Sequence, residues 1–241
     1  MSLGEVKTLV AVEDNSPAKD NVLRIEWNLG KRCNFDCSYC SPSIHSKSGE
    51  DLSLEVVQRT ARKLVNHARQ SGRSIRISLT GGEPYLHPQF IDLLRLLKDE
   101  GVDRISITSN GSIPTDRYLQ SLAFVDYLII SVHFEFIRVE KLKERVKIIQ
   151  QSLKESQRLH LHIMMLPGKV EQGLQLAQDL KGMGISYVLR RVRPQFTEEG
   201  LFLSPHQSGQ LGRPRADWEK IRQVGASYYS ANELALMGVD A

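Results

Sequence analysis

The stretch KRCNFDCSYC, residues 31–40, contains all three cysteines of the chain, Cys33, Cys37 and Cys40, in a C-x3-C-x2-C spacing. A disulfide framework would leave one of them unpaired, and a single reactive thiol would not need two neighbours. Three thiols on one short loop therefore indicate a metal site. A closed zinc site takes four protein ligands, as a cubane [4Fe–4S] cluster usually does. Held by only three thiolates, a cubane keeps one iron with an open position.

This spacing, with the aromatic Tyr39 directly before the last cysteine, resembles the signature of the radical S-adenosylmethionine (radical SAM) enzymes. A second stretch, Gly81-Gly82-Glu83, follows Thr80 at the end of the next predicted strand and resembles that family's GGE-type motif. The whole resemblance spans about residues 28 to 193. The alternatives that the cysteines leave open are a zinc-binding loop and an incidental group of thiols.

Outward from the cysteines, apolar residues alternate with polar ones in six segments, which predicts six strands. These strands are expected at 22–29, 74–80, 104–108, 126–133, 159–166 and 186–193. Helical spacing of apolar residues predicts intervening helices at 53–70, 88–100, 115–122, 142–153 and 174–180. Successive β-then-α units imply parallel strands joined by right-handed crossovers, and therefore an α/β fold.

Most of these strands have one polar face, for example Arg24, Glu26 and Asn28 in the first one. In an open doubly wound sheet both faces are covered by helices, and the strands are apolar nearly throughout. The polar faces therefore favour a curved (β/α)6 partial TIM barrel whose inner face holds a ligand, which is also the fold that the resemblance implies. The alternative is that some of these polar residues lie at strand ends on the surface.

The predicted organisation is an N-terminal lead-in at 1–21, a radical SAM core domain at 22–193 and a C-terminal extension at 194–241. A short helix is expected at 217–224. The sequence stops inside a second helical pattern at 232–237, which fits either a truncated form of a longer protein or a simple C-terminal helix.

Composition and charge argue against nucleic-acid-binding, membrane and secreted proteins. Lys and Arg total 32 and Asp and Glu total 28, and this net charge of +4 is too small to indicate a nucleic-acid partner. No apolar stretch approaches the roughly 20 residues of a membrane span. There is no signal-peptide pattern, and free cysteines suit a reducing compartment. We expect a cytoplasmic protein with no membrane contact.

The resemblance implies a role for individual positions. Cys33, Cys37 and Cys40 would bind three irons of a [4Fe–4S] cluster, and S-adenosylmethionine would bind the fourth. The expected contacts of S-adenosylmethionine are Tyr39 near the adenine, Gly81, Gly82 and Glu83 at the methionine end, Ser109 and Asn110 at the carboxylate or ribose, and Ser131 and His133 at the ribose. Residues 164–166 would pack on the adenine.

Candidates on the substrate side come from the residues themselves. Arg190, Arg191 and Arg193 lie at the end of the sixth predicted strand, where folds of parallel strands build their sites. An arginine there could hold a carboxylate or phosphate bidentately, although arginines facing solvent fit the pattern equally well. Glu26 and Arg76 are expected to pair across neighbouring strands in a structural role.

The resemblance then implies an activity of the oxidoreductase or lyase type. The reduced cluster would cleave S-adenosylmethionine, and the resulting 5′-deoxyadenosyl radical would take hydrogen from a small metabolite or a peptide. A one-electron donor such as a flavodoxin or ferredoxin would be needed. Two alternatives remain: an activase that places a glycyl radical on a partner enzyme, and a non-catalytic iron–sulfur or zinc protein. The catalytic residues and the substrate are not predicted.

Overall fold

Six parallel strands form one sheet in the computed structural model, which describes residues 21–40, 45–192, 194–197, 200–203 and 229–237. The sheet order is β1-β2-β3-β4-β5-β6, so each strand lies beside its neighbours in the sequence. The strands are β1 Val22–Asn28, β2 Ser74–Thr80, β3 Arg104–Ser109, β4 Tyr127–Val132, β5 Arg158–Met165 and β6 Ser186–Arg191.

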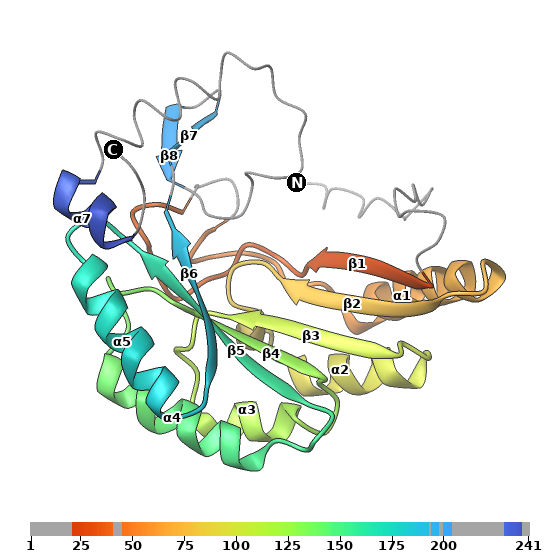
Figure 1. Ribbon diagram of the computed structural model, residues 1–241. Coiled ribbons are helices and arrows are strands. Elements are labelled where there is room, and N and C mark those ends of the chain that lie inside the picture. Colours follow the sequence, from red (N-terminus) through yellow and green to blue (C-terminus); the bar gives the residue numbers. More distant parts are fainter. Residues whose placement is uncertain (1–20, 41–44, 193, 198–199, 204–228, 238–241) are drawn as a thin grey trace.

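Five α-helices and one short 3-10 helix connect these strands, and α1 to α5 follow the outer side of the curved sheet (Figure 1). They are α1 Leu54–Gln70, η1 Pro84–Leu86, α2 Phe90–Asp99, α3 Thr115–Ser121, α4 Val139–Ser152 and α5 Val170–Gly182. Among the described residues β1 and β6 do not pair with each other, so the sheet stays open. The predicted α/β fold, a (β/α)6 partial barrel, is confirmed.

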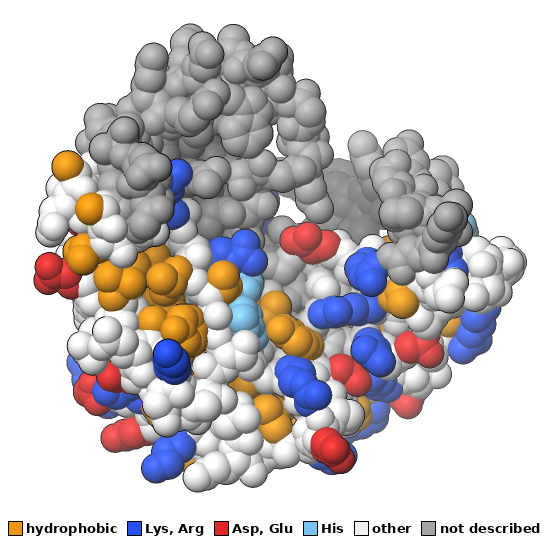
Figure 2. Space-filling model, viewed as in Figure 1, with side chains coloured by type: hydrophobic (Ala, Val, Ile, Leu, Met, Phe, Trp, Pro, Cys, Tyr) orange, Lys and Arg blue, Asp and Glu red, His pale blue; other side chains and the backbone are white. Residues whose placement is uncertain are grey.

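The two faces of the sheet differ as the sequence pattern predicts. Ile75, Ile77 and Leu79 of β2 are fully or almost fully buried and belong to the large core that the helices cover. The residues between them, Arg76 and Ser78, point to the inner face and keep partial contact with solvent. Figure 2 shows histidine, Lys and Arg side chains exposed within the hollow of this inner face.

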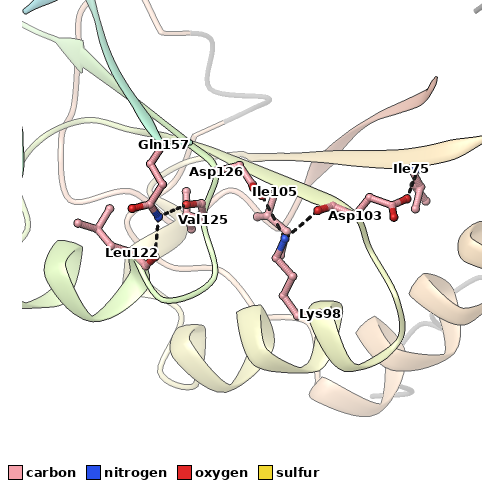
Figure 3. Close-up of polar contacts among 8 residues, drawn as sticks. All are labelled: Ile75, Lys98, Asp103, Ile105, Leu122, Val125, Asp126 and Gln157. Atoms are coloured by element: carbon pink, nitrogen blue, oxygen red, sulfur yellow. Dashed lines mark hydrogen bonds and ion pairs between the residues drawn. The ribbon is translucent and has the colours of Figure 1, made fainter. Parts of the chain in front are cut away.

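Polar side chains join neighbouring strands at the amino end of the sheet (Figure 3). Asp103, which precedes β3, accepts a hydrogen bond of 2.7 Å from the backbone N–H of Ile75 in β2. Asp126, which precedes β4, does the same for Ile105 in β3 at 2.8 Å and also binds the ammonium of Lys98 from α2 at 3.1 Å. Each carboxylate therefore satisfies a backbone donor at the start of the preceding strand.

Gln157 extends this arrangement to β5. Its side-chain amide donates to the backbone carbonyls of Leu122 and Val125, each at 2.6 Å, in the segment that leads into β4. We call Asp103, Asp126 and Gln157 the amino-end contacts. They fix the order of the strands from the side opposite to the cysteine loop.

The C-terminal part differs from the sequence prediction. Two short antiparallel strands that the sequence did not predict, β7 Pro194–Thr197 and β8 Gly200–Leu203, follow the sheet. Helix α7, Ala231–Leu236, lies where the last helical pattern was expected. Just before it, the hydroxyl of Tyr229 lies 2.5 Å from the carbonyl oxygen of Met165 and 2.8 Å from that of Val192.

Other predictions cannot be compared with the structure. The short helix at 217–224 and nearly all of the lead-in lie outside the described residues. Within the described residues, none of the helices combines the length and the apolar character that crossing a membrane requires.

Replacing Asp126 with Ala should lower the free energy of unfolding by about 1 to 3 kcal/mol, because it leaves the N–H of Ile105 and the ammonium of Lys98 without this acceptor. Urea unfolding measures the change. Asp92→Ala is the control, since Asp92 is exposed and pairs only with Arg95 on the same helix. Equal losses in the two variants would show that the amino-end contacts do not stabilise the sheet.

Candidate functional site

The cysteine loop leaves β1 and is bound by its backbone to the Gly81–Glu83 turn that follows β2. The N–H of Gly82 donates to the carbonyl of Gly30 at 2.9 Å, and the N–H of Glu83 donates to the carbonyl of Arg32 at 2.8 Å. On its other side, the N–H of Cys33 donates to the carbonyl of Ser46 at 2.8 Å. The first cysteine is therefore fixed between two segments of backbone.

The two glycines are needed because the cysteine loop passes so close to them. A Cβ atom on Gly82 would lie 2.2 Å from the carbonyl oxygen of Arg32, and one on Gly81 would lie 2.5 Å from that of Gly30. Gly81 also has a φ of +131°, which residues with a side chain rarely adopt. Part of what the sequence pattern assigned to a ligand is thus a requirement of the chain's own packing.

The carboxylate of Glu83 is buried and occupied by internal hydrogen bonds. It accepts from the backbone N–H of Asn110 at 2.6 Å, from the N–H of Tyr85 at 3.2 Å and from the hydroxyl of Ser109 at 3.0 Å. Burial raises its pKa to about 7, although these donors act in the opposite direction. A ligand beside this turn would consequently meet the backbone of Glu83 rather than its carboxylate.

Asn110 connects the end of β3 to the cysteine loop. Its side-chain amide donates to the oxygen of Asn34 at 2.9 Å and lies 3.6 Å from the sulfur of Cys33. The hydroxyl of Ser109 also lies 2.7 Å from that of Tyr118, so Ser109 belongs to an interior network. Of this predicted pair, only Asn110 lies against the cysteines.

The loop after β4 packs on the cysteine loop from the other side. The hydroxyl of Tyr39 lies 2.5 Å from Nδ1 of His133, and the two rings are stacked with centroids 5.8 Å apart. Phe35 stacks on Phe136 at 5.0 Å. The carboxylate of Glu135 accepts the backbone N–H of Ser38 at 2.9 Å, between the second and third cysteines.

Sequence reasoning identified His133 in this loop and missed Glu135 and Phe136. A signal for them exists in the sequence, because His133-Phe134-Glu135-Phe136 follows directly on a predicted strand. The carboxyl ends of parallel strands are where such folds place their sites. Aromatic and acidic side chains at that point are therefore candidates for contact with the cysteine loop.

All three cysteines lie in one apolar cluster at the carboxyl ends of β5 and β6. Cys37 and Tyr39 are buried there against Met164, Leu166 and Val192. Cys33 and Cys40 pack on the same cluster and are partly buried. Met164 and Leu166, which were expected near the adenine, thus pack against the cysteine loop, whereas Met165 between them lies in the core that the helices cover.

The environment of the thiols favours their protonated form. Burial raises the pKa of Cys37 to about 12, with the carboxylate of Glu135 and the thiol of Cys40 adding to the effect. Burial and the nearby Cys33 raise the pKa of Cys40 to about 11, and burial also raises the pKa of Cys33. One buried and two partly buried thiols that would repel one another as thiolates need bound cations to release their protons.

These residues fit an iron–sulfur cluster better than a single ion. Among the described residues, no group of three His, Cys, Asp or Glu side chains is placed to hold one metal ion. A cubane binds each thiolate at a different iron, so its ligands stand farther apart than those of one ion. The mutual electrostatic effects of Cys33, Cys37 and Cys40 show that the thiols are near one another.

Ser131, another predicted site residue, lies on β4. It is 3% exposed on the inner face of β4, and its hydroxyl has no hydrogen-bond partner among the described residues. Since buried hydroxyls usually have a partner, this orphaned group points to a missing ligand.

The expected pair of Glu26 and Arg76 is wrong. No ion pair joins the two side chains in the described strands, and the Arg76 guanidinium instead lies over the ring of Tyr127, 5.5 Å from its centroid. The face of the Tyr127 ring attracts the guanidinium and competes for it with the carboxylate of Glu26, which is partly solvated.

The model of the Radical SAM superfamily matches residues 27–191, which include the cysteine loop, the Gly81–Glu83 turn and almost the whole sheet. The chain belongs to the radical SAM superfamily. Radical SAM enzymes use a [4Fe–4S] cluster and S-adenosylmethionine, and they take a reductant and a substrate. The prediction of the family and of these cofactors is confirmed.

Curated relatives of this radical SAM chain include enzymes of two names. A probable GTP 3′,8-cyclase of Thermoplasma volcanium is 34% identical over 46% of this chain and 33% of its own length. A 7-carboxy-7-deazaguanine synthase of Clostridium acetobutylicum is 29% identical over 36% of this chain and 37% of its own. The GTP 3′,8-cyclase of Stenotrophomonas maltophilia is 29% identical over 62% and 47%. The chain spans about half or less of the length of these relatives.

Solved structures show the same fold at low sequence identity. The structure of anSMEcpe with bound AdoMet has a TM-score of 0.57 at 15% identity, and covers 73% of this chain and 51% of its own. Methylornithine synthase (PylB) has a TM-score of 0.53 at 12% identity, over 91% of this chain and 69% of its own. Both support the partial barrel of this radical SAM chain.

Gly82→Ala should prevent the cysteine loop from docking, since the added Cβ meets backbone atoms of Arg32 and Lys31 at 2.6 Å or less. We expect the iron bound per chain after anaerobic reconstitution to fall to a small fraction of the wild-type value. Gly182→Ala is the matched control, because a Cβ there meets nothing within 4 Å. Full iron loading of the Gly82 variant would contradict this account of the turn.

Glu83 should make stability depend on pH. Its folded pKa of about 7 exceeds the ordinary value of 4.5, so the folded state holds a proton that the unfolded state has lost. Its contribution is therefore fully present below pH 4.5 and disappears as the pH rises to about 7, by on the order of 3 kcal/mol. Urea unfolding of the reduced chain across this range should show the loss, and Glu83→Gln should flatten it. A slope unchanged in that variant would assign the effect to other groups.

Proposed function

We propose that this chain is a radical SAM enzyme that reductively cleaves S-adenosylmethionine and uses the resulting 5′-deoxyadenosyl radical to abstract hydrogen from a small-molecule substrate. One observation carries the proposal. The backbone of the Gly81–Glu83 turn holds the loop of the three thiols, of which Cys37 is buried and the other two are partly buried, at the carboxyl ends of the strands. We retain residues 22–193 as the core domain and 194–241 as its extension.

The cysteines would hold the cluster. Cys33, Cys37 and Cys40 would each give up a proton to bind iron, and the fourth iron would stay open to S-adenosylmethionine. The apolar side chains around Cys37, which include Met164 and Val192, would exclude water from one side of the iron–sulfur cluster. Such exclusion protects a radical from side reactions.

The loops after β2, β3 and β4 would hold S-adenosylmethionine. Backbone carbonyls of Gly81, Gly82 and Glu83 would accept from its amino group, since the carboxylate of Glu83 is occupied internally. The amide of Asn110, beside Cys33, would meet its carboxylate or ribose, and Ser109 would support it from the interior.

The inner face would hold the nucleoside end. The orphaned hydroxyl of Ser131 is available for a ribose oxygen. His133, whose Nδ1 faces the hydroxyl of Tyr39, would orient that ring beside the ribose and adenine. When bound, the cluster supplies the electron that cleaves S-adenosylmethionine, and the protein supplies orientation and a dry site.

A small molecule is the favoured substrate because the similar curated enzymes carry the names of small-molecule reactions, on GTP in one case. A flavodoxin or ferredoxin would supply the electron. We place the activity in the oxidoreductase or lyase class and the enzyme in the cytoplasm, as free thiols suit a reducing compartment.

Anaerobically reconstituted protein should release 5′-deoxyadenosine from S-adenosylmethionine only when dithionite is present, as measured by liquid chromatography. Cys37→Ala should reduce this release to background, because two thiolates hold a cubane poorly. Ser38→Ala is the matched control, since Ser38 lies in the same loop and only its backbone N–H makes the contact to Glu135. A wild-type protein that holds its cluster without releasing the product would instead support a non-catalytic iron–sulfur protein.

A further inference from the structure

The inner face of the sheet is strongly basic. Among the inner positions of β2 to β6, all of which the structure describes, six are basic and none is acidic. The basic residues are Arg76, Arg104, Arg158, His160, His162 and Arg190. Glu26 on β1 is the one acidic inner residue of the six strands. Figure 2 shows these types of side chain in the hollow of the described surface.

Three arginines of this face stand side by side. Arg24 pairs in register with Arg76, and Arg76 pairs with Arg104, so one row of β1, β2 and β3 carries three like charges. Like charges at directly opposite positions of a sheet are destabilising. A surface with such a row attracts anions and raises their local concentration.

Aromatic rings connect this row to the far side of the sheet. The guanidinium of Arg76 lies over the ring of Tyr127, whose centroid is 6.4 Å from that of His160. The rings of His160 and His162 are 5.3 Å apart and nearly perpendicular. Two positions after Arg76 on the same face, the hydroxyl of Ser106 donates to that of Ser78 at 2.7 Å.

Arg190 lies where this face meets the cysteine loop. It pairs in register with Met164, and Met164 packs in the same cluster as Cys37. Its charge acts on His160, because burial and then Arg190 lower the pKa of that imidazole. Nδ1 of His160 is 2.8 Å from the hydroxyl of Ser186, which leaves Nε2 for a ligand.

We propose that Arg190 and His160 bind an oxyanion group of the substrate, a carboxylate or a phosphate, so that the rest of the molecule reaches the cysteine loop. This inference rests on the proposed function and names its substrate class, a small anionic molecule. Arg190 and His160 lie on the same face of neighbouring strands, four positions apart in register, and a guanidinium and a neutral imidazole that converge from these positions offer several donors to one oxyanion. The arginine row of β1 to β3 adds long-range attraction.

The test uses the full chain with its cluster in place and 13C-labelled histidine. Inorganic phosphate and acetate are titrated separately at constant ionic strength, with chloride as the balancing anion. We expect saturable shifts of the His160 and His162 ring resonances, assigned through H160N and H162N, while the other described histidines stay unchanged. Arg190→Gln should weaken the affinity about tenfold, the loss typical of one charge-assisted hydrogen bond.

Arg59→Gln on the exposed side of α1 is the control, since it removes the same charge from the outer surface and should leave the affinity unchanged. Saturation by phosphate alone supports a phosphorylated substrate, saturation by acetate alone supports a carboxylate, and saturation by both supports an oxyanion site of either kind. No saturable shift with either probe, or equal affinity in Arg190→Gln, overturns the proposal. Release of 5′-deoxyadenosine, measured on the same samples, reports separately on the proposed function.

Discussion

The structure depends on two backbone hydrogen bonds that join the cysteine loop to the turn after β2, from Gly82 to Gly30 and from Glu83 to Arg32. They place the first cysteine at the carboxyl end of the sheet. The carboxylate of Glu83 then connects this turn to the end of β3, because it accepts a hydrogen bond from the backbone N–H of Asn110. Loops from three consecutive strands are thereby held together as one unit by the chain's own hydrogen bonds.

Much of the fold could be predicted from the sequence, because alternating residues such as Ile75, Arg76 and Ile77 report directly on which face of a strand is covered. The prediction that the three cysteines bind the cluster rests in the same way on their spacing. Pairings between side chains could not be predicted. Arg76 has two possible partners within reach of its long side chain, and the sequence gives no measure of the distance to Tyr127.

The roles within the turn were also only partly predictable. A Gly-Gly pair indicates that another group approaches the backbone closely. The pattern does not distinguish a ligand from another segment of the chain. Here the backbone of Gly30 and Arg32 fills the space. Likewise, Glu135 contacts the cysteine loop across a long separation in sequence, and β7 and β8 are too short for a clear alternating pattern.

The amino-end contacts of Asp103, Asp126 and Gln157 have a consequence for how the protein can change. They join the strands at the edge remote from the cysteine loop, so the order of the strands does not rest on the contacts of the opposite loops alone. Apart from the cysteine loop and the Gly81–Glu83 turn, which pack closely on each other, loops at the carboxyl ends can therefore vary with little penalty in foldability.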